Sequence, residues 1–192
     1  MGEPVARVDE RDRVVGVADR WRAVREGWLH RVAVTVCRDE HGRVVVHRRA
    51  ERLARYPGWY EVVVGGAVGA GESYARAAGR ELTEELGILV PVRPLFRFLN
   101  RSGLSPHWLG VHEAVVPDVV VPDAREVAWY GRLTVPELWS VVREWPFTPD
   151  SHEVLGRAAV PGKECGCLVG YRSPGSPTRC GPCSGRTRCW SR

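Results

Sequence analysis

The chain has 192 residues with 28 basic and 23 acidic side chains, and its formal net charge at pH 7 is +5. This length suits one domain with a hydrophobic core of ordinary size. No stretch reaches the ~20 apolar residues that a membrane-spanning helix needs, and the N-terminal sequence MGEPVARVDERDR lacks the apolar run of a secretory signal. We therefore expect a cytoplasmic protein with no membrane partner.

The positive charge is concentrated near the C-terminus. Residues 161–192 contain one acidic side chain, Glu164, and six basic ones: Lys163, Arg172, Arg179, Arg186, Arg188 and Arg192. Residues 1–160 then hold equal numbers of acidic and basic side chains, which gives no general signal for nucleic acid. The sequence predicts a folded domain at 1–160 and a basic tail at 161–192, with nucleic acid as a partner only through that tail.

Five of the six cysteines lie in the same tail. They follow the order C-x-C, twelve residues, C-x-x-C, five residues and a last cysteine: Cys165, Cys167, Cys180, Cys183 and Cys189. A zinc knuckle is one interpretation. A disordered extension is favoured, because Gly, Pro, Ser and Arg dominate the tail, C-x-C is a weak half-site and no histidine accompanies it.

The first half of the domain is predicted to consist mainly of strands. An apolar run at 14–17 precedes a polar, helical stretch at 19–26. Residues 31–37 and 43–48 alternate and are rich in β-branched side chains, and the intervening His41-Gly42 predicts a hairpin turn.

A basic connection follows, and Pro57-Gly58 interrupts it. Residues 59–64 form a predicted strand that leads the chain into a loop containing Gly65, Gly66, Gly69 and Gly71. Such glycines permit backbone angles that other residues avoid.

The helix after this loop carries three carboxylates on one face. Glu81, Glu84 and Glu85 have the spacing i, i+3 and i+4, which places their side chains together. Like charges at this spacing repel by a few tenths of a kcal/mol per pair. A divalent cation would neutralise them, and Mg²⁺ prefers carboxylate oxygens together with substrate phosphates.

Another face of this helix, roughly a third of a turn from the carboxylates, is predicted to pack on a sheet. Its apolar stripe consists of Ala75, Ala78, Leu82 and Leu86. Gly79, a weak helix former, suggests close packing, and Gly87 suits the left-handed residue that ends a helix.

The second half of the domain adds strands and one more helix. Residues 92–100 and 107–116 read as strands separated by Ser102-Gly103. A helix is predicted at 135–145, with Thr134 and Glu137 spaced as a capping box. Strands on both sides of one helix predict an α/β fold in which a mixed β-sheet lies between helices.

The glycine loop and acidic helix resemble the Nudix box. Gly66, five residues, Glu72, seven residues and then the sequence RELTEELGI from Arg80 to Ile88 match that box at every defined position. The resemblance implies a Nudix-type α/β/α sandwich and a hydrolase that cleaves a nucleoside diphosphate linked to another group. Mg²⁺, or alternatively Mn²⁺, is the implied cofactor.

The resemblance also implies roles for individual residues. Glu84 and Glu85 would be the principal metal ligands, and Glu81 a further ligand or the base that activates water. Glu72 and Arg80 would brace the loop against the helix. Glu126 stands where the family often adds an acid, although a surface role is an equal alternative.

Substrate contacts are expected close to the box. Arg48 and Arg49 end a strand, and an arginine fork suits phosphate, so we expect one of the two to face the substrate. Gly66 and Trp59 are the other predicted contacts, with a core role as the alternative for the tryptophan. His30 and His107 are the histidines to test for substrate contact.

The sequence from His47 to Ser73 resembles the isopentenyl-diphosphate isomerase-like branch of the superfamily. In true isomerases a catalytic cysteine lies on the strand that enters the glycine loop. Residues 60–64 here, YEVVV, contain neither cysteine nor histidine, so hydrolysis is favoured over isomerisation.

Two classes of function follow. The first is a Mg²⁺-dependent pyrophosphohydrolase whose partner is a small-molecule diphosphate. The second is a non-catalytic binding or regulatory module that keeps the fold. The repulsive carboxylate cluster favours the enzyme, and the sequence leaves open which diphosphate is bound and whether the protein is a homodimer.

Overall fold

The computed structural model describes residues 2–158, so the predictions for the C-terminal tail lie outside the described residues. The elements in chain order are β1 (Pro4–Val8), β2 (Val14–Asp19), α1 (Arg20–Arg25), β3 (Arg31–Arg38), β4 (Val44–Arg49), β5 (Tyr60–Glu61), β6 (Val64–Ala67), α2 (Tyr74–Leu86), β7 (Arg93–Asn100), β8 (His107–Val115), β9 (Val127–Leu133), α3 (Val135–Val141) and α4 (Pro149–Arg157). None of these helices is long and apolar enough to cross a membrane.

The main sheet is mixed, as the sequence predicts. Its strands follow the order β5-β4-β3-β8-β7, with β6 also paired to β3 and β9 to β4. β3 and β8 run parallel from Arg31↔Trp108 to Arg38↔Val115, and the other pairs are antiparallel. A separate antiparallel hairpin of β1 and β2 precedes α1.

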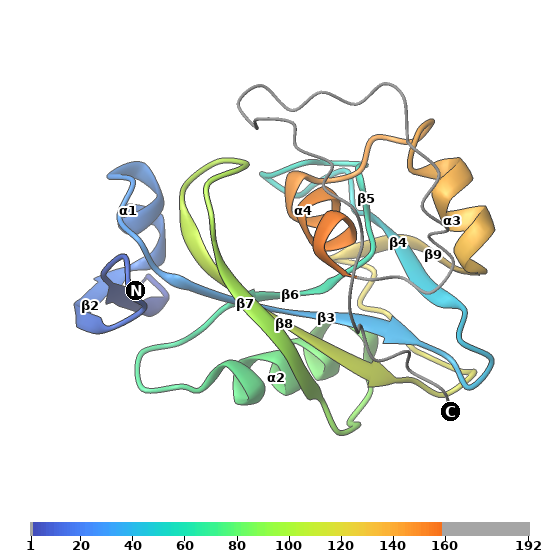
Figure 1. Ribbon diagram of the computed structural model, residues 1–192, viewed down its shortest axis with the longest axis horizontal. Coiled ribbons are helices and arrows are strands. Elements are labelled where there is room, and N and C mark those ends of the chain that lie inside the picture. Colours follow the sequence, from blue (N-terminus) through green and yellow to red (C-terminus); the bar gives the residue numbers. More distant parts are fainter. Residues whose placement is uncertain (1, 159–192) are drawn as a thin grey trace, which may run out of the picture. The chain divides into compact units, whose positions relative to one another are not determined.

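Helices cover both faces of this sheet (Figure 1), with α2 on one side and α3 and α4 on the other. Alternate residues of β3 point to opposite faces. Val34 and Val36 pack with Leu138 of α3 and Leu155 of α4, whereas Cys37 belongs to the cluster around α2. The expected α/β/α sandwich is confirmed.

The signals at both ends of α2 explain its bounds. Ser73 Oγ accepts a hydrogen bond from Arg76 N at the first turn, and Gly87 ends the helix with φ 67°. Two details of the predicted packing are wrong. Ala75 is exposed while Ala77 is buried in its place, and a Cβ at Gly79 would meet nothing within 4 Å, so close packing does not explain that glycine.

The strand predicted at 59–64 is two strands. Tyr60 and Glu61 pair with β4, and the chain then moves across to pair with β3 from Val64 onward. The predicted helix at 135–145 ends at Val141, although its capping box between Thr134 and Glu137 is present.

The sequence did not predict β1, β9 or α4. β9 lacks a buried–exposed alternation because most of its residues are half-buried. α4 has no side-chain cap hydrogen bond, but Thr148, Pro149 and Asp150 at its start are residues typical of a helix N-terminus, a signal that the sequence prediction missed.

Candidate active site

The carboxylates of α2 line a cavity of about 590 Å³, which we call the acidic cavity. β6 supplies its glycine backbone, α2 its acidic wall, and the segment before β9 its far side. The residues around it are Glu3, Arg20, Arg49, Gly65, Gly66, Arg80, Glu81, Glu84, Glu85, Asp123, Arg125 and Glu126. The predicted residues Glu81, Glu84, Glu85, Glu126, Arg49 and Gly66 therefore meet at one site.

Two of these carboxylates hold their protons more tightly than an exposed glutamate does. Burial, followed by the charges of Glu61 and Glu81, raises the pKa of Glu85 well above its usual value. Burial also raises the pKa of Glu81, against the lowering effect of Arg80. In both cases burial is the largest cause, because it disfavours the charged form of a carboxyl group.

Arg80 binds both the loop and the acidic face. Its guanidinium donates to Glu72 at 3.2 Å and to Ala67 O at 2.9 Å. Nη1 of the same side chain contacts Glu81 Oε1 at 2.7 Å and Glu84 Oε2 at 3.0 Å. Within residues 2–158 no three acidic, histidine or cysteine side chains are close enough to hold a metal as they stand.

Glu72 connects Arg80 to the glycine loop, since its carboxylate also accepts a hydrogen bond from Gly69 N at 2.9 Å. Burial alone would raise its pKa, but the hydrogen bonds from Arg80 and Gly69 outweigh it and lower the pKa. A carboxylate with a lowered pKa stabilises the fold above its unfolded pKa, and that contribution is lost as the pH falls through the folded pKa.

We expect Glu72→Gln to lower the free energy of unfolding by about 1–3 kcal/mol at pH 7, the cost of weakening charged hydrogen bonds. Urea unfolding measures this, with the exposed Glu10→Gln as a control expected within about 0.5 kcal/mol of wild type. The difference should shrink as the pH is lowered below about 4.5. If Glu72→Gln and Glu10→Gln were equally stable at pH 7, the stabilising role assigned to the Glu72–Arg80 interaction would be contradicted.

Glu61 is a site residue that the sequence did not reveal. Its carboxylate accepts from Arg49 Nη1 at 2.9 Å and lies 3.1 Å from His47 Nε2. Burial would raise its pKa, but the hydrogen bond with His47 and the charge of Arg49 lower it instead. Glu61 is therefore a half-buried side chain that favours its anionic form, and its charge contributes to the raised pKa of Glu85.

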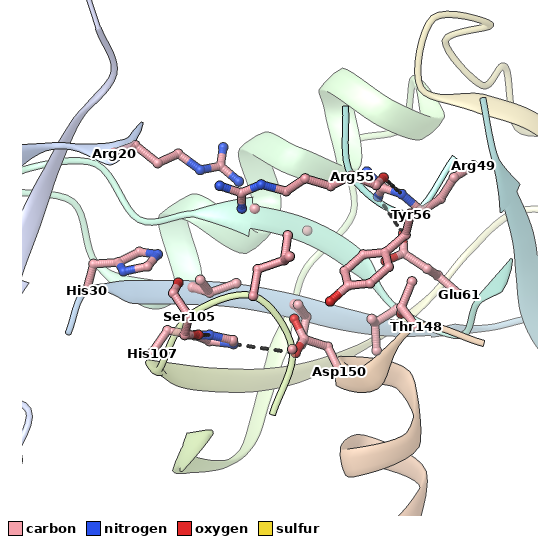
Figure 2. A pocket seen from close by; sticks show the side chains of 17 residues that line it. Arg20, His30, Arg49, Arg55, Tyr56, Glu61, Ser105, His107, Thr148 and Asp150 are labelled. Carbon is pink, nitrogen blue, oxygen red and sulfur yellow. Dashed lines mark hydrogen bonds and ion pairs between the residues drawn. The ribbon is translucent and has the colours of Figure 1, made fainter. Parts of the chain in front are cut away.

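A second cavity of about 120 Å³ adjoins the first, and we call it the arginine–histidine cavity. Arg20, Arg49, Gly65 and Gly66 line both cavities. The polar side chains that line the second one are shown in Figure 2: Arg20, His30, Arg49, Arg55, Tyr56, Glu61, Ser105, His107, Thr148 and Asp150.

Both predicted histidines line this second cavity, in different protonation environments. Burial, partly opposed by a hydrogen bond with Trp28 O, lowers the pKa of His30 to about 4. Burial would also lower the pKa of His107, but its contact with Asp150, at 3.6 Å, raises it.

Arg48 and Trp59, two predicted substrate contacts, line neither cavity. Arg48 donates to Gly58 O at 3.0 Å and pairs with Glu51, so it holds the preceding loop, while its neighbour Arg49 faces the site. Trp59 is 36% exposed and packs on Tyr56 with 5.2 Å between ring centroids.

The model of the NUDIX domain family matches residues 28–155, which include the strands of the main sheet, the glycine loop and α2. The chain belongs to the Nudix family. It is 46% identical over 153 residues to the uncharacterised Nudix hydrolase SCO1686 of Streptomyces coelicolor, a match that covers 78% of this chain and 84% of that one. A second uncharacterised relative, PA4841 of Pseudomonas aeruginosa, is 36% identical, with 80% and 91% coverage.

Solved structures share the fold of this chain. The crystal structure of DR0079 from Deinococcus radiodurans superposes with a TM-score of 0.72 at 28% identity, covering 82% of this chain and 99% of that one. The NUDIX domain of Shewanella oneidensis NrtR, solved with ADP-ribose, shares the fold with a TM-score of 0.53 at 16% identity, and the match covers 66% of this chain and 83% of that one. The expected Nudix membership and fold are confirmed.

One relative of this Nudix protein is an isopentenyl-diphosphate Δ-isomerase from Burkholderia multivorans, 30% identical over 168 residues, with 84% and 96% coverage. The described part of the chain contains one cysteine, Cys37, in the core cluster against α2. Burial raises the pKa of its thiol to about 12. Cys37 lines neither cavity and is unsuited to act on a substrate.

Proposed function

We propose that this Nudix protein is a Mg²⁺-dependent pyrophosphohydrolase that cleaves the phosphoanhydride of a nucleoside diphosphate derivative or a related small diphosphate. The supporting observation is the acidic cavity, which is lined by Glu81, Glu84 and Glu85 together with Arg49. Family membership supports hydrolysis, and the arrangement of acids and arginines supports a substrate with linked phosphates.

The donor atoms suit a hard divalent cation. The candidate ligands Glu81, Glu84 and Glu85 offer only carboxylate oxygens, the donors that Mg²⁺ prefers. The raised pKa values of Glu81 and Glu85 indicate charge that a cation would stabilise. Arg80 contacts both Glu81 and Glu84, so a bound cation would compete with Arg80 for these two carboxylates. The hydrogen bonds of Arg80 to Glu72 and Ala67 would still hold the loop.

A bound Mg²⁺ would offset charge on the phosphate oxygens and increase the acidity of water. The protein's own part is to position water and accept its proton, for which Glu81 is the candidate and Glu126 the alternative. The water oxygen bonds to phosphorus, and the bond from phosphorus to the bridging oxygen breaks. The bridging oxygen leaves with the electron pair as part of a phosphate, near the positive charge of Arg49.

A substrate panel tests this proposal. Phosphate or nucleotide release is measured from nucleoside diphosphates, nucleoside triphosphates, ADP-ribose and isopentenyl diphosphate, with Mg²⁺, with Mn²⁺ and with EDTA. We expect metal-dependent hydrolysis of at least one compound and a loss of about 100-fold or more in kcat/KM for Glu84→Gln, because removing a metal contact costs several kcal/mol.

Glu40→Gln is the matched control, since Glu40 is exposed in the turn after β3. Its activity should equal that of wild type. Undiminished activity of Glu84→Gln would remove the assigned metal site. Double-bond migration in isopentenyl diphosphate, without hydrolysis of any compound, would favour the isomerase, and binding without turnover would favour a regulatory module.

A further inference from the structure

Two arginines of the arginine–histidine cavity face each other without a carboxylate between them. Figure 2 shows Arg20 and Arg55 extending toward one another from opposite sides of the cavity. Arg20 begins α1, and Arg55 lies in the loop between β4 and β5. Like charges repel at close range, so the fold brings together two cations at a cost in free energy.

Nitrogens of both side chains have no protein acceptor. Arg55 Nη2 and Arg20 Nε are buried and make no hydrogen bond within the described residues. Arg20 Nη1 contacts Glu3 Oε2 at 2.9 Å, whereas the guanidinium of Arg55 lies over the ring of Trp21 at 4.8 Å. Burial, followed by the charges of Arg20 and Arg49, lowers the pKa of Arg55, while Tyr56 and Asp150 act in the opposite direction. Buried donors without acceptors are rare in folded proteins.

The loop that carries Arg55 is fixed in an unusual conformation. Tyr56 has a φ of 47°, which residues with a side chain rarely adopt and which is common at functional sites. Arg49 Nε donates to Arg55 O at 3.1 Å, and Trp59 N donates to Tyr56 O at 3.2 Å. These bonds hold Arg55 at the cavity in advance of any ligand.

The anionic side chains around the cavity already have partners. Glu61 binds His47 and Arg49. Asp150 accepts from Asn100 Nδ2 at 2.7 Å and lies close to His107. Neither carboxylate forms an ion pair with Arg20 or Arg55, and Glu3 pairs with Arg20 alone. Among the described residues the guanidinium of Arg55 therefore keeps a positive charge that an anionic ligand would balance.

The size and place of the cavity limit this ligand. Its volume of about 120 Å³ is well below the roughly 300–1,000 Å³ of cavities that hold a drug-sized molecule. It adjoins the acidic cavity along Arg49, Gly65 and Gly66. It therefore suits one small anionic group of a molecule whose remainder lies in the larger cavity.

We propose that Arg20 and Arg55 bind the terminal phosphate of the substrate, one phosphoanhydride bond beyond the phosphorus that water attacks beside α2. This inference rests on the proposed hydrolysis and narrows its substrate class. Guanidinium groups bind the oxygens of a free phosphate in a fork-like geometry. The preferred substrates are nucleoside or small-molecule diphosphates and triphosphates that end in a free phosphate, rather than compounds whose second phosphate carries a sugar.

Binding without turnover tests the site directly. The full chain in EDTA is titrated with inorganic diphosphate by calorimetry, as wild type and as Arg55→Gln, Arg20→Gln and Arg143→Gln. Arg143 is exposed after α3 and lines neither cavity, so its variant controls for the change in net charge. We expect binding at least tenfold weaker in the first two variants and unchanged in the third.

If all four proteins bound inorganic diphosphate equally, or if wild type did not bind it, the proposed phosphate site at Arg20 and Arg55 would be wrong. Thermal melting checks that each variant is folded. Arg55→Lys, which keeps the charge but not the fork, should recover part of the affinity, and it keeps the site testable even if Arg55→Gln does not fold.

A matched pair of substrates separates this inference from the proposed function. With Mg²⁺, wild type should hydrolyse ADP with a kcat/KM at least tenfold above that for ADP-ribose, and Arg55→Gln should bring the ratio close to one. The inference would be overturned if wild type had a higher kcat/KM for ADP-ribose than for ADP and if Arg55→Gln changed both values by the same factor. The proposed hydrolase function would still stand in that case. If no compound in the panel is hydrolysed, the proposed function itself fails.

Discussion

Glu85→Gln is expected to reduce Mg²⁺-dependent hydrolysis by on the order of 10³-fold. Metal assistance contributes several kcal/mol to such reactions, and each 1.36 kcal/mol corresponds to a tenfold rate. Glu85 lines the acidic cavity beside Glu81, and its neutral isostere keeps the shape while removing the charge. Steady-state kinetics with the best substrate of the panel measure the loss.

The same substitution should stabilise the metal-free protein at neutral pH. Burial and neighbouring carboxylates raise the pKa of Glu85, so the folded protein binds this proton more tightly than the unfolded chain does. The destabilisation is absent below about pH 4.5, the ordinary value, and grows as the pH rises through the folded pKa. If Glu85→Gln removes about 1 kcal/mol of this destabilisation, Tm should rise by roughly 2–4 °C.

Thermal melting in EDTA between pH 4.5 and pH 8 checks this sign. The Tm advantage of Glu85→Gln over wild type should widen with pH, and adding Mg²⁺ should stabilise wild type more than the variant. A variant that is less stable than wild type in EDTA at pH 8, or that keeps full activity, would contradict the role assigned to Glu85.

Gly65→Ala is expected to lower the free energy of unfolding by more than about 3 kcal/mol, a fall in Tm of roughly 6–12 °C. A Cβ at this position would lie 2.1 Å from Ala33 O and 2.7 Å from Val34 Cα, both backbone atoms of β3. Backbone in a paired strand has little room to move, so β6 would separate from β3. Because β6 borders both cavities, hydrolysis should fall with stability.

Gly16→Ala in β2 is the control for this substitution. A Cβ there would meet nothing within 4 Å, and Ala reduces the freedom of the unfolded chain. Its stability should be within about 0.5 kcal/mol of wild type or slightly higher. Urea unfolding of both variants gives the comparison, and equal stability of Gly65→Ala and Gly16→Ala would show that the β3–β6 contact is not tight.

The sequence predicted best the features that depend on local spacing. The acidic face of α2, its Gly87 terminus and the capping box at Thr134 follow from residues a few positions apart. The mixed sheet follows from β-branched segments around one helix. The resemblance to the Nudix box implied the brace between Glu72 and Arg80, and these two residues form an ion pair in the structure.

Features that depend on distant segments were not predictable. Glu61 appears in the sequence as an ordinary strand residue, and only the pairing of β5 with β4 brings it to His47 and Arg49. Arg20 and Arg55 come from unrelated elements that converge only in the folded chain. Arg48 and Arg49 are adjacent in β4, so their side chains point to opposite faces of the sheet. The sequence alone did not show which of the two faces the site.

Binding of Mn²⁺ followed by electron paramagnetic resonance tests most directly whether the acids of α2 hold a divalent cation. Wild type should bind the ion without substrate, and the double variant Glu84→Gln with Glu85→Gln should lose that binding and the hydrolysis together, while Glu40→Gln keeps both. Unchanged Mn²⁺ binding in the double variant, or hydrolysis by wild type that persists in EDTA, would contradict a metal-dependent site on this helix.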